Sequence, residues 1–175
     1  MPLKLTWDDL LIQNITPAET ARCLEMWDHL VHGRVAPVFM SKFGDWFLRR
    51  PDGGTVMLSV LEGTVVTIAG TPEEFSACVN TQDWQELHLL SLQVHELHQR
   101  GLVPGPGQCF GFAPHPVFTG KINVSTAMVM DIPVWQSICS QLFAPKKAGR
   151  AESSAPPNGR SLGSSGTGEA PSSAN

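Results

Sequence analysis

The chain has 175 residues, 42% of them hydrophobic and 16% charged, and it carries a formal net charge of −4 at pH 7. This length and composition are those of an ordinary globular protein with one domain and a substantial core. No segment approaches the roughly 18 consecutive apolar residues of a membrane span, and Asp8 and Asp9 stand where a signal peptide has its apolar centre. We therefore expect a cytoplasmic protein.

Composition changes sharply after Pro145. Residues 146–175 are rich in Ser, Gly, Ala and Pro and contain Leu162 as their only large apolar side chain. Burial in this segment cannot offset the entropy lost on ordering it. We expect one folded domain over residues 1–145 and a disordered tail over residues 146–175.

Charge is divided unevenly between these two parts. Four basic and two acidic side chains give residues 146–175 a charge of +2, which leaves −6 for residues 1–145. An acidic domain disfavours direct binding to nucleic acid, because that binding depends on neutralising phosphates with Lys and Arg. The same charge suits a basic protein partner.

The first predicted helix covers residues 17–32. Thr16, Pro17 and Glu19 form a capping box with proline in the first helical position, and apolar residues then recur at helical spacing. Three short stretches rich in Val, Leu, Phe, Thr and Ile follow, separated by turn residues. They predict an antiparallel meander with strands near 44–50, 55–61 and 64–69.

Two more helices are predicted after the meander. Thr71 opens a short helix that ends near Asn80, and Asp83 opens a long central helix that ends at Arg100, with Gly101 as its C-terminal stop. The apolar face of the long helix is expected to contain Trp84, Leu87, Leu90, Val94 and Leu97.

A glycine- and proline-rich run, GLVPGPGQCFGFAPHPVFTG, precedes a predicted strand in KINVSTAMVMD. Pro133 then opens a final helix whose apolar side contains Val134, Ile138 and Leu142. Strands and helices do not alternate as βαβ units, so the pattern predicts an α+β fold with an antiparallel meander, an N-terminal helix, a long central helix and a C-terminal strand-helix.

The glycine-proline run does not match an enzymatic loop. Its glycines are followed by no lysine, and the FAPHP segment after them is a poor helix start, which excludes a phosphate-binding loop. Cys109 with His115 faintly resembles a thiol protease site, but two prolines and Gly111 deny Cys109 the helix that would lower its pKa.

Metal binding is also disfavoured. His88, His95 and His98 lie on one predicted helix, but His95 and His98 are spaced i,i+3 rather than as in HExxH, so a solvated histidine pair is the preferred interpretation. The cysteines lack any CxxC or Cys/His spacing, so we expect reduced thiols and neither a metal nor a cofactor. These cysteines are Cys23, Cys78, Cys109 and Cys139.

Two motifs resemble a known family. The segment FGDWFLRRPDGGTVMLSVLEG, followed by a short acidic helix, and the segment GLVPGPGQCFGFAPHPVFTGKINVS, followed by a strand and helix, are similar to the C-terminal domain of type VI secretion DNase immunity proteins and to single-domain bacterial relatives. The resemblance covers about residues 3 to 144. Its most specific residues are Phe43, Gly44, Asp45, Gly105, Pro106, Gly107, Gln108, Cys109, Phe110, Gly111 and Phe112.

The resemblance implies a non-enzymatic protein that binds and neutralises a cognate DNase toxin. About forty residues precede Phe43, where characterised members have a separate N-terminal domain. A regulatory or scaffold module without a toxin, and a metal- or thiol-dependent enzyme, remain the alternatives. We expect Asp45 and Trp46 to face the partner, and Phe110 and Phe112 to anchor the glycine-proline run to the core.

Overall fold

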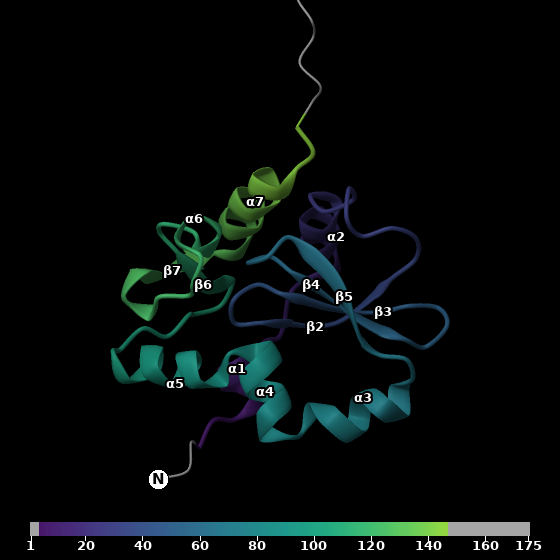
Figure 1. The fold of residues 1–175 in the computed structure, drawn as a ribbon, viewed down its shortest axis with the longest axis horizontal. Coiled ribbons are helices and arrows are strands. Elements are labelled where there is room, and N and C mark those ends of the chain that lie inside the picture. Colours follow the sequence, from purple (N-terminus) through teal and green to yellow (C-terminus); the bar gives the residue numbers. More distant parts are fainter. Residues whose placement is uncertain (1–3, 147–175) are drawn as a thin grey trace, which may run out of the picture. The chain divides into compact units, whose positions relative to one another are not determined.

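A computed structural model of the chain describes residues 4–146 (Figure 1). The predicted tail over residues 146–175 lies outside this range apart from its first position. Seven strands and seven α-helices are found in the described part of the chain, with one short 3-10 helix, η1, at Val124–Thr126. The α+β class predicted from the sequence is confirmed.

The main sheet has five antiparallel strands in the order β1-β2-β3-β4-β5. The strands β3, β4 and β5 form the predicted meander, whereas β1 and β2 are not predicted from the sequence. Their bounds are Leu11–Ile12 for β1, Ala36–Ser41 for β2, Trp46–Arg49 for β3, Thr55–Ser59 for β4 and Thr64–Ala69 for β5.

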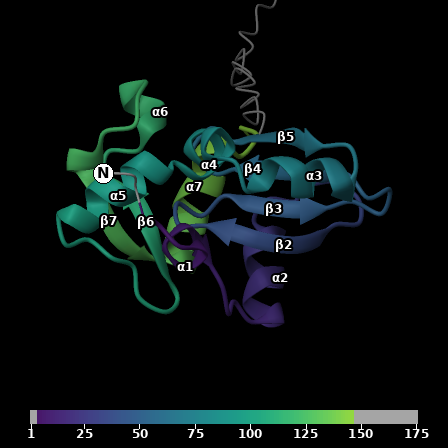
Figure 2. The same ribbon diagram turned by 90° about the horizontal axis from the view of Figure 1, so that it is seen from below.

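Helices cover both faces of this sheet (Figures 1 and 2). On one side lie α3 (Pro72–Val79) and α4 (Gln82–Leu89), and on the other α2 (Pro17–Glu25) and α7 (Ile132–Phe143). Neighbouring strand residues point to opposite faces. Trp46 and Phe47 therefore point to opposite faces, and both are buried because helices cover each face.

A second sheet pairs β6 (Gln108–Phe112) with β7 (Ala127–Asp131). It lies next to α5 (Ser91–Gln99) and α7, and the connection between its strands contains the one-turn helix α6 (Pro116–Thr119). The sequence pattern predicts that no helix starts in the FAPHP segment. His115 nevertheless caps α6, because its ring Nδ1 accepts a hydrogen bond from the Val117 N–H.

Two predicted helices are shorter than expected. The first, predicted over 17–32, ends at Glu25, because hydrogen bonds from residue i to i−3 tighten the next turns around the buried Trp27. The predicted long central helix is broken at Leu90, which has a left-handed backbone with φ 51°. It is therefore two helices, α4 and α5, and the first is capped by Thr81 rather than Asp83.

Because α4 and α5 are separate helices, they need not share one buried face. The first buries Trp84 and Leu89, and Leu87 is 72% exposed although the sequence placed it on the buried face. The final helix is also rotated from its predicted orientation. Its predicted apolar side is exposed, and the helix instead buries a mixed face made of Ile132, Trp135, Gln136, Cys139 and Ser140. The reason is that Trp135 and Gln136 form buried hydrogen bonds that outweigh the aliphatic stripe.

Candidate functional site

The FGD motif forms the turn between β2 and β3. The Ser41 N–H donates to the Asp45 carbonyl across 2.8 Å, and Gly44 holds φ 93°, a conformation that favours glycine. This turn brings the Asp45 side chain beneath the end of β4. There the carboxylate accepts hydrogen bonds from the Val60 N–H at 2.8 Å and from the Ser41 hydroxyl at 3.1 Å.

Asp45 and Trp46 do not form a partner-facing pair. Asp45 is 4% exposed and Trp46 is 1% exposed, so that prediction is wrong. The turn points Asp45 inward because its carboxylate supplies acceptors for backbone and hydroxyl donors that would otherwise be unsatisfied.

Burial, with a smaller contribution from the nearby Glu62 carboxylate, raises the pKa of Asp45 to about 6 against the opposing effect of hydrogen bonds from Val60 and Ser41. The folded state therefore holds this proton more tightly than the unfolded chain does. The stabilisation that results is fully present below about pH 4 and is lost as the pH rises through about 6.

We expect this titration to be visible as a stability difference. Asp45→Asn removes the titrating group, so the unfolding free energy of the wild type should fall relative to the variant by about 2 kcal/mol from about pH 4.5 to about pH 7.5. Urea unfolding at both pH values measures this, with the exposed Asp52→Asn as the matched control. Parallel changes in wild type and Asp45→Asn would contradict the assignment.

Gln136 is the centre of a second buried polar cluster. Its Oε1 accepts hydrogen bonds from the indole N–H groups of Trp27 at 2.7 Å and Trp46 at 3.2 Å, and its Nε2 donates to the Gly44 carbonyl at 2.7 Å. The neighbouring Trp135 indole donates to the Phe43 carbonyl at 2.9 Å. The cluster joins α7 to the FGD turn, and the sequence offered no signal for Gln136.

The glycine-proline motif is built into the fold rather than exposed as a loop. Phe110 and Phe112 are buried and both pack on Phe43, which confirms that they anchor the run. Gly107 has a positive φ of 73°, a conformation that favours glycine. Gly111 does not, and it is small for another reason: a side chain there would collide with Met130 and Trp135.

Gln108 and Cys109 are the first two residues of β6. The side-chain oxygen of Gln108 accepts a hydrogen bond from the Gly105 N–H at 3.0 Å, which closes the turn before the strand. Cys109 is fully buried, and burial raises the pKa of its thiol above the ordinary value. A thiol in that environment stays protonated, which removes the physical basis for a nucleophilic role.

The three histidines considered as metal ligands each contact a neighbouring side chain. His98 lies 3.7 Å from Asp9, His95 is hydrogen bonded to Gln99, and His88 packs on the Trp84 ring. Within residues 4–146, no group of three or more His, Cys, Asp or Glu side chains is arranged to hold a metal ion.

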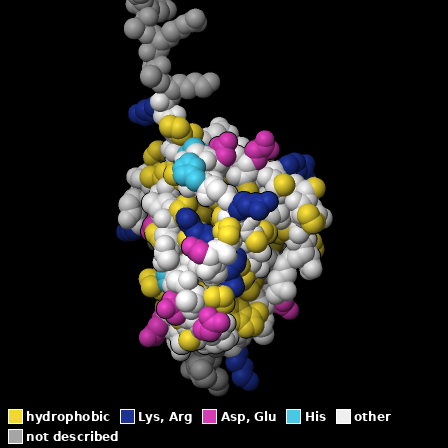
Figure 3. All heavy atoms as spheres, turned by 90° about the vertical axis from the view of Figure 1, so that its right-hand side faces the viewer, with side chains coloured by type: hydrophobic (Ala, Val, Ile, Leu, Met, Phe, Trp, Pro, Cys, Tyr) yellow, Lys and Arg dark blue, Asp and Glu magenta, His cyan; other side chains and the backbone are white. Residues whose placement is uncertain are grey.

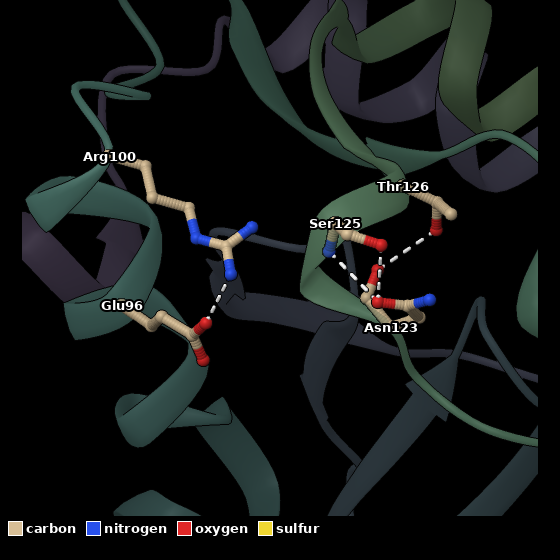
Figure 4. A network of polar contacts seen from close by, with 5 residues as sticks. All are labelled: Glu96, Arg100, Asn123, Ser125 and Thr126. Carbon is tan, nitrogen blue, oxygen red and sulfur yellow. Dashed lines mark hydrogen bonds and ion pairs between the residues drawn. The ribbon is translucent and has the colours of Figure 1, made fainter.

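The exposed polar contacts near α5 and η1 join residues that are close in the sequence (Figure 4). Arg100 pairs with Glu96 one helical turn away at 2.6 Å, and Asn123 accepts hydrogen bonds from Ser125 at the start of η1. On the face shown in Figure 3, Lys, Arg, Asp and Glu side chains are interspersed with hydrophobic ones. Neither feature concentrates the groups needed for a reaction or a strongly charged patch.

The strongest candidate site is a cavity of about 400 Å³ bounded by β4, α4 and α6, which we call the α4–α6 cavity. Its volume is within the range of about 300–1,000 Å³ found for ligand sites. The lining combines apolar side chains with two carboxylates and two basic side chains. It consists of Asp45, Met57, Ser59, Leu61, Glu62, Leu87, His88, Leu90, Pro116, Val117, Gly120, Lys121 and Ile122.

Exposed apolar side chains lie at the cavity. Leu87 on α4 and Val117 on α6 line it and are 72% and 48% exposed, and Phe118, the next residue after Val117 on α6, is 70% exposed. Burial lowers the pKa of His88, which favours a neutral ring beside the carboxylates at neutral pH. Leu87, His88 and Leu90 fall on one predicted helix, but the sequence does not bring them together with Asp45, because the lining comes from four separate chain segments.

Comparisons with known proteins do not assign this chain to a family. No family model and no curated protein matches it. Among solved structures, Atu4351 from Agrobacterium tumefaciens is similar at a TM-score of 0.46 and 14% sequence identity, over 69% of this chain and 63% of that one. The chain thus spans less than two thirds of that protein, and the family resemblance proposed from the sequence motifs stays a prediction.

No helix in the described part of the chain is long and apolar enough to cross a membrane.

Proposed function

We propose that this chain is a non-enzymatic protein-binding domain of the type VI immunity kind, which neutralises a cognate DNase toxin in the cytoplasm by direct binding. The observation that carries the proposal is an exposed apolar rim, made of Leu87, Val117 and its neighbour Phe118, at a cavity whose lining includes Glu62 and Asp45. The sequence motifs that resemble the immunity family support the same conclusion.

The rim has the chemistry of a protein contact. Exposed apolar side chains that cluster beside a cavity are typical of interaction sites, and aromatic residues such as Phe118 contribute strongly when a partner covers them. A nuclease presents a basic surface to DNA, and residues 1–145 carry a charge of −6. Opposite charges would speed association and orient the two surfaces.

The proposal is tested with a nuclease encoded next to this gene and the full chain. We expect the chain to form a complex with the nuclease, to block plasmid cleavage and to protect cells that express it. Phe118→Asp and Leu87→Asp should each weaken inhibition by about tenfold or more, because they place a charge in the contact.

Val134→Asp is the matched control, since Val134 is exposed on α7 and belongs to no part of the rim. An association rate that does not fall with added salt would contradict steering by charge. Failure of the wild-type chain to bind or inhibit the nuclease would favour a regulatory or scaffold module instead.

A further inference from the structure

The α4–α6 cavity has a carboxylate on its sheet side. Phe47 pairs with Met57 across β3 and β4, and side chains two residues apart point to the same face of a sheet. Asp45 therefore shares a face with Phe47, Met57 and Ser59, of which Met57 and Ser59 also line the cavity. Glu62 adds a second carboxylate from the turn after β4.

Neither carboxylate has a positive partner. The ion pairs within residues 4–146 are His98 with Asp9 and Arg100 with Glu96, and neither includes Asp45 or Glu62. Asp45 is buried, so its hydrogen bonds offset only part of the cost of its charge, whereas Glu62 is exposed to solvent. A cation in the cavity would supply the countercharge that Asp45 lacks.

Asp45 also keeps acceptor capacity for such a ligand. Its carboxylate accepts from Val60 and Ser41 and has a further hydrogen bond with Ser59, which leaves about one of its four acceptor sites for a ligand. A guanidinium presents several N–H groups in one plane, so it could donate to that site and to Glu62 together, and it is more weakly hydrated than an ammonium. The apolar walls, which include Leu61, Leu90 and Ile122, suit the methylene stem of the same side chain.

We propose that the α4–α6 cavity receives an arginine side chain of the partner protein, with its guanidinium on Asp45 and Glu62 and its stem against the apolar walls. This inference rests on the proposed function, since it specifies how a basic nuclease surface would be held. An arginine inserted in this way would be one that the nuclease otherwise uses to contact DNA phosphates. Its capture would make binding and inhibition the same event.

The test uses the full chain and n-butylguanidinium as the probe, followed by NMR. We expect saturable shifts of the Val60 amide and the Leu61 and Leu90 methyl groups, with an affinity on the order of millimolar for so small a ligand. The neutral isostere n-butylurea should cause none of these shifts, and n-butylammonium should bind more weakly.

Two variants of the cavity lining are expected to change the affinity for the probe in opposite directions. Glu62→Gln should weaken binding of the probe by about threefold or more, and Lys121→Gln should strengthen it, because one removes an attracting charge and the other a repelling one. Glu73→Gln, on an exposed position of α3 outside the cavity, should change nothing. The Glu62 and Lys121 side chains make no hydrogen bond within residues 4–146, so these variants should fold.

Equal shifts with n-butylurea, tighter binding of n-butylammonium, or no effect of Glu62→Gln would overturn the assignment. The result separates this inference from the proposed function. If the chain inhibits the nuclease but n-butylguanidinium causes no shifts, the arginine site is wrong and the proposed function stands. If the probe binds but the nuclease is not inhibited, the site stands and the immunity role is wrong.

Discussion

Gln136→Leu should lower the free energy of unfolding by about 4 kcal/mol, the largest effect expected for a single substitution in this protein. Gln136 is fully buried, and leucine would leave the indole N–H groups of Trp27 and Trp46 and the Gly44 carbonyl without partners. Each buried group left unsatisfied costs about 1–3 kcal/mol, and the added apolar contact of leucine offsets part of the sum.

Denaturant unfolding of the variant and of Gln141→Leu measures this effect. Gln141 is on the same helix but is exposed, and its side chain contacts only the Ser137 hydroxyl. We expect Gln141→Leu to change stability by less than about 0.5 kcal/mol. A loss below about 1 kcal/mol for Gln136→Leu would show that the cluster is not needed to join α7 to the FGD turn.

The final helix shows which structural features can be predicted from the sequence and which cannot. Its existence and a start at Pro133 are predicted from proline in the first turn and from apolar spacing; the helix is present and starts one residue earlier, at Ile132. Its orientation does not follow, because periodicity favours the aliphatic stripe of Val134 and Ile138. The helix buries Gln136 instead, and a buried glutamine can be recognised only when its three partners are known.

The interruption at Leu90 has a similar cause. Nothing in the sequence between Asp83 and Arg100 breaks a helix, since no glycine or proline occurs there. The left-handed backbone of Leu90 is strain imposed by packing, with Leu89 buried on one side of the break and Val94 on the other. Leu90 at the break and Leu87 just before it both line the α4–α6 cavity, so the error in the helix prediction and the missed site concern the same segment.

The FGD motif shows the opposite case, in which the sequence identified the right residues for the wrong reason. The resemblance drew attention to Asp45, and adjacent acidic and aromatic residues suggested a surface for a partner. Asp45 is instead a buried acceptor with spare capacity, and it reaches a ligand only through the cavity. The chemistry of the residue was readable from the sequence, but its exposure depended on the turn around Gly44.

Gly44→Ala should therefore be costly, and Gly107→Ala much less so. Both glycines have positive φ, 93° and 73°, which costs alanine about 1–2 kcal/mol. At Gly44 a new Cβ would also lie 3.0 Å from the Gln136 Nε2 and 3.1 Å from the Trp135 Cδ1, whereas nothing lies within 4 Å at Gly107. Because the Gln136 amide and the Trp135 indole are held by hydrogen bonds, neither can withdraw without breaking one.

We expect the Gly44→Ala variant to lose about 3 kcal/mol or more and Gly107→Ala about 1 kcal/mol, as measured by denaturant unfolding. The difference between the two isolates the contact with the buried cluster from the cost of the backbone conformation. Equal losses would mean that the cluster yields to the extra methyl group. A large difference would mean that glycine is required in the FGD motif by the packing of α7 against the turn, and that this packing fixes Asp45 at the wall of the cavity.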